Sequence, residues 1–330
     1  MYRFILVVAV LLLPLSSRGA APERPEPGIS RVLVVSIDGL RPDVLLRADT
    51  PRMHEMMKEG SFSMWAKTTP ASITLPSHVS MFTGVVPEVH AIFWNAELPL
   101  AKPVYPNSPT LFELARRAGY TTAIAAGKNK FDIFDKPQIG HAPAALSWKF
   151  ITTSTKCTDD EVTEHALDII REHQPEVMFV HLPECDSVGH ASGWGTDQQL
   201  ATVAHADQCI GKIEDLLAEL KLADSTFTIV TSDHGGAGRT HGPEDPRSRS
   251  IPWIATGPGV RRNFDLTRLG RDFDVNTYDT FATACYVLGI PITYRIDGKP
   301  IHQIFDNQEM MISTFQPSMA PATMPSAKGG

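Results

Sequence analysis

Acidic residues and histidines follow three apolar runs of the sequence, each at the point where the run ends. Asp38 follows "RVLVVSI", Asp186 and His190 follow "EVMFVHL", and Asp233 with His234 follows "TFTIVTS". Carboxylates and imidazoles together suit Zn²⁺ or a similar divalent metal. If the three apolar runs are parallel strands of one sheet, their carboxyl ends bring these side chains to one rim, where ligands bind in open α/β sheets.

The spacing within these segments supports a metal site over simpler explanations. Asp186 and His190 are four residues apart, so one helical turn or a compact loop points both the same way. In "TSDHGGAGRTHG", His241 follows His234 by seven residues, and the segment contains four glycines. The alternatives are a loop-capping carboxylate for Asp38 and a surface hydrogen bond between Asp186 and His190. Neither alternative explains the whole set.

A single hydroxyl, Thr74 in "TLPSH", precedes a segment that reads as a packed helix. A threonine hydroxyl is a poor nucleophile unless a base or a metal removes its proton. Pro76 suits the first turn of a helix, and backbone amides at a helix start favour a bound anion. A plain helix cap would explain Thr74 or Ser77, but not the metal-type residues elsewhere. Thr74 is therefore a candidate nucleophile at an anion-binding helix start.

Strand-like and helix-like segments alternate along the chain, which predicts an α/β fold: a three-layer sandwich with a mostly parallel central sheet flanked by helices. The predicted strands are 31–37, 121–126, 176–182, 226–232 and 250–257. The predicted helices are 50–60, 108–119, 158–173, 199–220 and 276–290, together with one that begins near residue 74. Residues 85–107, rich in proline and aromatic residues, are expected to form a surface excursion over the sheet edge.

Composition excludes some classes of function. The net charge of −7 comes without basic blocks, so a nucleic-acid-binding surface is not expected. A chain of 330 residues with 42% hydrophobic content can bury one large core or two modest ones. Its four cysteines show no C-x-x-C spacing, which argues against a zinc site built from cysteines. They are expected either to form one or two disulfides or to act as small buried apolar residues.

The two ends of the chain differ from the middle. Residues 1–21 carry an early arginine, an apolar run and small residues, the pattern of a secretory signal peptide, with an uncleaved anchor as the alternative. The mature protein is then expected to be exported, periplasmic or secreted, with no transmembrane span after signal removal. Residues 309–330 lack periodicity and are expected to be disordered, which leaves 30–305 as the folded domain.

The ordered set "SIDG", "TLPSHVSMFTG", "CDSVGH" and "SDHGG…THG…IPWIATGPG" resembles the alkaline phosphatase superfamily. Within it, the chain is most similar to the type I phosphodiesterase/nucleotide pyrophosphatase group, over residues 31 to about 305. The resemblance implies an alkaline-phosphatase-like phosphodiesterase domain with two divalent metal ions, usually zinc. The implied ligands of the first metal are Asp38, Thr74, Asp233 and His234, and those of the second are Asp186, His190 and His241.

One ligand remains open, because the third ligand of the second site varies in sequence position within the family. His302 is the substitute for His241, whereas His78 and His181 are expected to be structural. The resemblance further implies hydrolysis of a phosphoric ester, with Thr74 attacking phosphorus and a metal ion stabilising each of the entering and leaving oxygens. Phosphodiester or pyrophosphate cleavage is the favoured reaction, on a small phosphate- or phosphonate-bearing substrate.

Three residues bear on the choice of substrate. Many nucleotide pyrophosphatases have an asparagine that helps to hold a phosphoryl oxygen where this chain has Ser77, which can still donate a hydrogen bond. Lys128 and Lys130 in "AAGKNKF" resemble lysines that phosphonoacetate hydrolases place near the substrate's carboxylate; otherwise they are solvated lysines. A phosphonoacetate-type hydrolase is therefore the main alternative. A phosphomonoesterase, a sulfatase or a non-catalytic metal-binding protein is a weaker alternative, and the sulfatase pattern C/S-x-P-x-R is not met at Thr74–His78.

Overall fold

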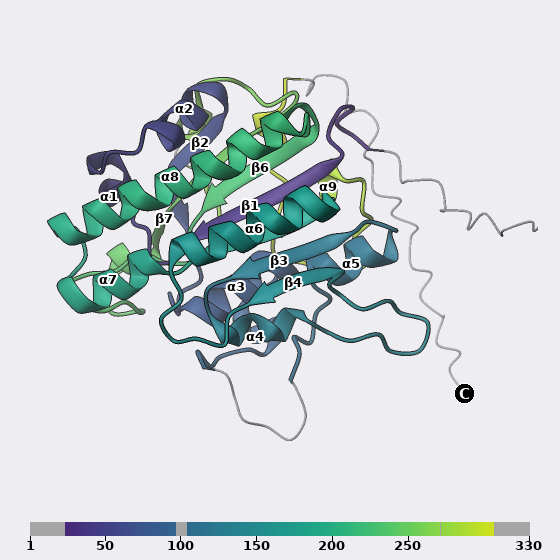
Figure 1. The fold of residues 1–330 in the computed structure, drawn as a ribbon, viewed down its shortest axis with the longest axis horizontal. Helices are drawn as coiled ribbons and strands as arrows, with labels where there is room; N and C mark the ends of the chain where they lie inside the picture. The colour runs from purple at the N-terminus through teal and green to yellow at the C-terminus, as the bar shows by residue number, and fades with distance from the viewer. Residues whose placement is uncertain (1–23, 97–103, 271, 307–330) are drawn as a thin grey trace, which may run out of the picture.

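The computed structural model describes residues 24–96, 104–270 and 272–306, and its centre is one eight-stranded sheet (Figure 1). In order across the sheet, the strands are β4 (Trp148–Ile151), β3 (Thr122–Ala126), β5 (Val177–Leu182), β1 (Arg31–Ile37), β6 (Thr226–Thr231), β7 (Ser250–Thr256), β2 (Ser61–Lys67) and β8 (Phe264–Asp265). The predicted signal peptide, residues 97–103 of the predicted surface excursion and the predicted tail lie outside the described residues.

The sheet is mostly parallel, as predicted. Parallel pairing joins β4 to β3, β3 to β5, β5 to β1 and β1 to β6, and β2 pairs with β8 in the same way. The exception is β7, which runs antiparallel to both β6 and β2. The five predicted strands are all present, whereas the short or half-exposed strands β2, β4 and β8 were not predicted.

Helices cover both faces of the sheet, which confirms the three-layer arrangement (Figure 1). One layer contains α1 (Pro42–Arg47), α2 (Pro51–Glu59), α6 (Asp159–His173), α7 (Glu184–Ser192) and α8 (Asp197–Glu219). The other contains α3 (Thr74–Thr83), α5 (Leu111–Arg117) and α9 (Asp279–Val287), with the short helix α4 (Pro87–His90) beside α3. Within the described residues, short 3₁₀ turns complete the elements: Asn129–Phe134, Ala223–Ser225, Pro246–Arg249, Leu266–Leu269 and His302–Ile304.

Two hydrophobic cores lie on opposite faces of the sheet, and β1 contributes to both. Val32 and Val34 belong to the core under α3, α5 and α9, whereas Leu33 and Val35 belong to the core under α6 and α8. Successive side chains of a strand point to opposite faces, so a strand with helices on both sides is apolar throughout. This explains the continuous apolar run from which the sequence predicted β1.

A tight turn after β1 brings two elements of the sheet's carboxyl rim together. Gly39 has φ +73°, a left-handed conformation that side chains with a Cβ rarely adopt. A Cβ at this position would lie 3.0 Å from Asp186 Cα, at the first turn of α7. The Trp194 indole nitrogen donates a hydrogen bond of 2.8 Å to the Gly39 carbonyl and closes the turn from the other side.

The four cysteines, Cys157, Cys185, Cys209 and Cys285, are all unpaired and buried. This agrees with the expectation that they act as small apolar residues, and the alternative of one or two disulfides is wrong. Among the helices that the structure describes, none is both long and apolar enough to cross a membrane.

Replacing Gly39 by alanine should separate β1 from α7, because the added methyl group meets the α7 backbone at Asp186 Cα and the ring of Trp194. We expect Gly39→Ala to lower the free energy of unfolding by about 1–3 kcal/mol more than Gly140→Ala. Gly140 has φ +58° and no heavy atom within 4 Å of the position that a Cβ would occupy, so it reports backbone strain alone. Chemical denaturation of both variants tests this, and equal losses would contradict it. Bound metal, measured on the same samples, should fall only in Gly39→Ala.

Candidate metal centre and active site

Three neighbouring parallel strands deliver the predicted metal ligands to one rim. Asp38 directly follows β1, and Asp233 with His234 follows β6. Asp186 and His190 lie on α7, one helical turn apart, just after β5. The Asp38, Asp233 and His234 side chains have no solvent exposure, Asp186 is nearly as buried, and His190 reaches the surface.

The first predicted ligand set surrounds one nitrogen. Thr74 Oγ1 and Asp233 Oδ2 each lie 3.3 Å from His234 Nε2, and Asp38 Oδ1 lies 3.4 Å from it. Nitrogen and oxygen ligands that share a tetrahedral Zn²⁺ are about 3.3 Å apart, given metal–ligand bonds of about 2.0–2.1 Å. Each of these three oxygens is therefore at ligand spacing from His234 Nε2, and the triad of metal-type side chains whose ligand atoms all lie close together here is Asp38, Asp186 and His234.

The second predicted set is built around Asp186. Its Oδ1 lies 3.4 Å from His190 Nε2 and 3.7 Å from His241 Nε2. The same oxygen is 4.0 Å from His234 Nε2, so the two sets adjoin, and the His234 and His241 rings stack with centroids 3.7 Å apart. Of the two histidines considered for this position, the structure brings His241 to Asp186 and places His302 against the Tyr286 ring instead.

Each histidine of the rim has its other ring nitrogen held by a backbone carbonyl. His234 Nδ1 donates a hydrogen bond to the Gly235 carbonyl oxygen at 2.8 Å, and His190 Nδ1 donates to the Arg239 carbonyl oxygen at 3.0 Å. His241 Nδ1 donates to a third backbone carbonyl oxygen at 2.8 Å. This third carbonyl belongs to Ser72, a buried residue with a left-handed φ of +49°. Such bonds fix the tautomer in which Nε2 carries a lone pair toward a metal.

At the rim, three of the buried carboxylate oxygens that have no hydrogen-bond partner among the described residues lie together: Asp38 Oδ1, Asp186 Oδ1 and Asp233 Oδ2. They are the same oxygens that face the histidine Nε2 atoms. A buried charged oxygen without a partner is strongly destabilising, and native structures satisfy such groups with hydrogen bonds, waters or ions. The residues present thus fit a divalent metal in chemistry and in spacing.

The outer oxygens of the carboxylates are held by other groups. Lys128 Nζ lies 2.6 Å from Asp38 Oδ2 and 2.7 Å from Asp186 Oδ2, so one ammonium joins both predicted metal sets. His181 Nε2 lies 2.8 Å from the same oxygen of Asp38. Burial alone would raise the pKa of Asp38, but Lys128 and His181 hold it well below its usual range. Asp38 is therefore an ionised carboxylate, and His181 positions it, in keeping with its predicted structural role.

Thr74 is the first residue of α3, as predicted, but its hydroxyl does not cap the helix. The N-cap position is Ile73, without a side-chain cap, and the Thr74 hydroxyl points to His234 instead. Beneath it, His78 Nδ1 donates to the Thr74 carbonyl at 2.9 Å, and His78 Nε2 bonds with Ser36. Burial lowers the pKa of His78 to about 4, so this ring is neutral and structural, as expected.

The remaining substrate-binding candidates have different surroundings. The Ser77 hydroxyl is fully buried and lies 3.1 Å from Thr69 Oγ1, so the described contacts tie it to the interior rather than to the metal ligands. Lys130 Nζ lies 3.0 Å from Asn95 Oδ1, and the same oxygen accepts a 2.9 Å hydrogen bond from the Leu75 amide. Lys130 therefore sits at the start of α3, next to the Thr74 side of the rim.

Asn95 is the site residue that sequence reasoning missed. It lies in the segment expected to be a surface excursion, where Ile92 and His90 are in fact buried. The segment carries no periodic pattern and no strand end, so nothing in the sequence directs Asn95 toward Thr74. Its amide group can hold the helix start through its oxygen and still donate through its nitrogen to an anion there.

The helix that carries Asp186 is locked to its neighbour by two reciprocal hydrogen bonds. The Asp159 amide donates to Glu184 Oε2 at 2.8 Å, and the Glu184 amide donates to Asp159 Oδ1 at 3.0 Å. Each carboxylate thus satisfies an amide at the start of the other helix, which would otherwise lack a partner. This pair fixes the first turn of α7 against the first turn of α6.

Comparison with solved structures agrees with this fold. The chain superimposes on the murine ectonucleotide pyrophosphatase/phosphodiesterase 5, solved as an inactive threonine-to-alanine variant with AMP, with a TM-score of 0.69 and 16% identity. That match covers 84% of this chain and all of the other. The phosphonate monoester hydrolase of Agrobacterium radiobacter matches with a TM-score of 0.61 and 15% identity, over 84% of this chain and 77% of the other.

The relatives found by sequence comparison are longer than this chain, and the similarity covers only part of each of them. Ectonucleotide pyrophosphatase/phosphodiesterase family member 7 of Mus musculus is 26% identical over 247 residues, which are 70% of this chain and 54% of the relative. The catalytic subunit of GPI ethanolamine phosphate transferase 2 of Homo sapiens is 22% identical over 322 residues, 89% of this chain but 31% of that protein. The chain thus spans about half or less of the length of these curated relatives.

A family model covers most of the region that carries the site. It matches residues 32–242, from β1 to just beyond His241, and therefore includes both predicted ligand sets. This match extends over more than half of the sequence, and the ordered motifs, the sheet and the rim of aspartates and histidines agree with it. The chain belongs to the type I phosphodiesterase/nucleotide pyrophosphatase family.

Proposed function

We propose that this protein is a metal-dependent hydrolase of phosphoric esters that cleaves phosphodiester or pyrophosphate bonds through a threonine nucleophile. The observation that carries the proposal is the position of Thr74. Its Oγ1 lies at the start of a helix, 3.3 Å from His234 Nε2, and that nitrogen also faces two buried carboxylate oxygens that lack hydrogen bonds within the described part of the chain. A hydroxyl with no hydrogen-bonding role in the helix cap is free to act chemically.

The proposal includes two divalent ions at the rim, and Zn²⁺ suits its mixture of imidazole and carboxylate ligands. The proposed ligands of one ion are Asp38, Thr74, Asp233 and His234. Those of the other are Asp186, His190 and His241. When bound, the ions would supply Lewis-acid stabilisation of charge on the entering and leaving oxygens. Lys128 would keep the two sets together through the outer oxygens of Asp38 and Asp186.

The proposed reaction transfers the substrate's phosphoryl group first to Thr74 and then to water. Thr74 Oγ1 attacks phosphorus, the bond to the leaving oxygen breaks on the opposite side, and a phosphothreonine ester forms. Water then cleaves that ester and restores the hydroxyl. The Thr74 backbone amide and the Asn95 side-chain nitrogen would donate to the phosphoryl oxygens, because the Leu75 amide already bonds to Asn95 Oδ1 and Pro76 has no N–H. His181 and His78 remain behind these groups and keep Asp38 and Thr74 in place.

A phosphonate hydrolase is the second candidate, and Lys130 favours it. Its ammonium lies beside Asn95, and no carboxylate is within ion-pair distance of it among the residues that the structure describes. Burial, and after it the charge of Lys128, lowers the pKa of Lys130. A second anionic group of a substrate, such as the carboxylate of phosphonoacetate, would provide the missing partner. Lys128, in contrast, already has two carboxylate partners.

The proposal includes the organisation of the whole chain. Residues 1–21 would be removed as a signal peptide, and residues 30–305 would form the catalytic domain. The protein would then work outside the cytoplasm, in the periplasm or in the medium. Relatives whose names begin with "ectonucleotide" are consistent with this placement. Sequencing the amino terminus of the protein recovered from outside the cytoplasm would locate the cleavage site.

Removing the Thr74 hydroxyl should abolish turnover. We expect Thr74→Ala to lower kcat for an aryl phosphodiester by about 1,000-fold or more, because the covalent step loses its nucleophile. Thr74→Ser keeps a hydroxyl and should retain far more activity. Thr83→Ala is the matched control, since Thr83 ends the same helix and its hydroxyl bonds only to the Val79 carbonyl among the described contacts. Diester turnover that survives in Thr74→Ala would reject the proposed nucleophile.

Removing the Lys130 charge should discriminate between substrates. We expect Lys130→Met to lower kcat/KM for phosphonoacetate relative to an aryl phosphodiester by about tenfold or more, the effect of losing one charge-assisted hydrogen bond. Lys156→Met, on the exposed loop before α6, is the control and should leave the ratio unchanged. If the unaltered enzyme does not turn over phosphonoacetate while it cleaves the diester, the phosphonate candidate is wrong.

A further inference from the structure

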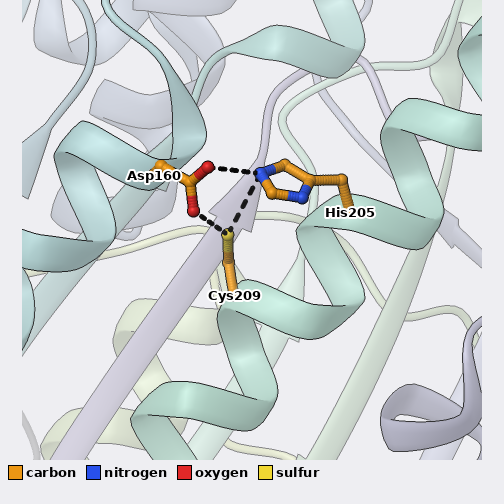
Figure 2. Close-up of side chains that lie close together, drawn as sticks. All are labelled: Asp160, His205 and Cys209. Carbon is orange, nitrogen blue, oxygen red and sulfur yellow. Dashed lines mark hydrogen bonds and ion pairs between the residues drawn. The ribbon is translucent and has the colours of Figure 1, made fainter.

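A second group of metal-ligating side chains lies outside the rim, between α6 and α8 (Figure 2). Asp160 is in the first turn of α6, and His205 and Cys209 are on α8. The two α8 residues are four positions apart, so their side chains share one face of the helix. Figure 2 shows all three side chains converging on the space between the two helices.

The three ligand atoms are spaced as donors to one ion. His205 Nε2 lies 3.1 Å from Asp160 Oδ2, Cys209 Sγ lies 3.9 Å from His205 Nε2, and Cys209 Sγ lies 4.0 Å from Asp160 Oδ1. Around a tetrahedral Zn²⁺, the expected separations are about 3.3 Å between nitrogen and oxygen and about 3.6 Å when one atom is sulfur. Shifts of a few tenths of an ångström would therefore place all three in one coordination shell.

The surroundings allow an ion to enter. Asp160 and His205 side chains are 49% and 35% exposed, whereas Cys209 is fully buried beneath them. An ion from solvent would thus meet the carboxylate and the imidazole first and the sulfur last. Lys212, one turn after Cys209, donates to Asp160 Oδ1 at 2.8 Å and leaves Oδ2 facing His205. A surface ion pair accounts for Asp160 with Lys212, but it does not account for a thiol aimed at the same point.

We propose that Asp160, His205 and Cys209 form a third metal site, for Zn²⁺ or a similar thiolate-binding divalent ion, with water in the fourth coordination position. The nitrogen, oxygen and sulfur donors match the ligand preferences of Zn²⁺ and exclude Mg²⁺ and Ca²⁺, which take oxygen ligands. Binding replaces the thiol proton with the metal, and this proton goes to solvent. No electron transfer is involved.

This site is chemically distinct from the rim, where the proposed ligands include aspartate, threonine and histidine but no cysteine. It is nevertheless connected to the rim in sequence. Asp160 directly follows Asp159, which is locked to Glu184 at the start of α7. An ion that joins α6 to α8 would therefore brace the helix against which α7 is positioned.

Cobalt titration of the full-length chain, stripped of metal, tests the proposal with a signal that the rim cannot give. A thiolate bound to Co²⁺ produces a sulfur-to-metal charge-transfer absorption band, whereas imidazole and carboxylate ligands do not. We expect the band to appear and saturate in the unaltered protein and to disappear in Cys209→Ala. His205→Ala should weaken Co²⁺ binding by more than the roughly 10–100-fold that loss of an outer-sphere partner costs.

Two further variants keep the test decisive. Cys285→Ala removes a fully buried cysteine from α9, on the opposite face of the sheet, and should leave the band unchanged. Lys212→Met removes the ammonium that competes for Asp160 and should strengthen Co²⁺ binding, whereas loss of a merely structural ion pair would not. Circular dichroism confirms that each variant is folded. No charge-transfer band in the folded, unaltered protein, or a band that persists in Cys209→Ala, would overturn the proposal.

Discussion

Three buried aspartates at adjoining strand ends are the constraint on which the rest of this structure depends. Asp38, Asp186 and Asp233 each leave one oxygen without a hydrogen bond inside the described part of the protein, and these oxygens face the same histidines. Like charges this close repel each other strongly in a low-dielectric interior. Burial and the charge of Asp38 accordingly raise the pKa of Asp233. Lys128 neutralises only part of this charge, which favours the binding of a further cation at the rim.

The surrounding fold can be understood as the means of holding these charges in position. Both faces of the sheet are packed with apolar side chains, which keeps the strand ends rigid. Around the rim, carbonyls of Gly235, Arg239 and Ser72 orient the histidines, and His181 orients Asp38. Such outer contacts decide whether ligands remain within the few tenths of an ångström that coordination and catalysis require.

Much of the rim could be predicted because its residues follow recognisable strands. Continuous apolar runs identified β1, β5 and β6, and the polar residues immediately after them had few structural explanations. Residues reached through tertiary packing could not be found in this way. Asn95 approaches Thr74 from an aperiodic segment. Lys128 was among the predicted substrate-binding residues, but its ion pairs with Asp38 and Asp186 could not be read from the sequence. Ser77 was expected near the substrate from its place in "TLPSH", but the turn of α3 directs its hydroxyl to Thr69.

The pattern of apolar residues also did not predict that β7 runs antiparallel, or that β2, β4 and β8 are strands. An antiparallel strand inside a parallel sheet has the same apolar run as its neighbours, so periodicity does not reveal its direction. The short strand β8 and the irregular strand β2 are stabilised by pairing at the sheet edge rather than by their own composition.

The strand order has a consequence for how the protein acquires its site during synthesis. The central strand, β1, is made first, but its partners β5 and β6 come much later: His181, which bonds to Asp38, follows it by 143 residues, and Asp233, which accepts from the Gly39 amide, follows Gly39 by 194. Contacts this distant in sequence form slowly, since long loops must close before any pairing stabilises them. The strand that precedes Asp38 therefore lacks both of its neighbouring strands until β5 and β6 have been synthesised. The rim of aspartates and histidines is therefore among the last parts of the molecule to form, and a chain truncated before β6 would contain Asp38 and Thr74 without Asp233 and His234.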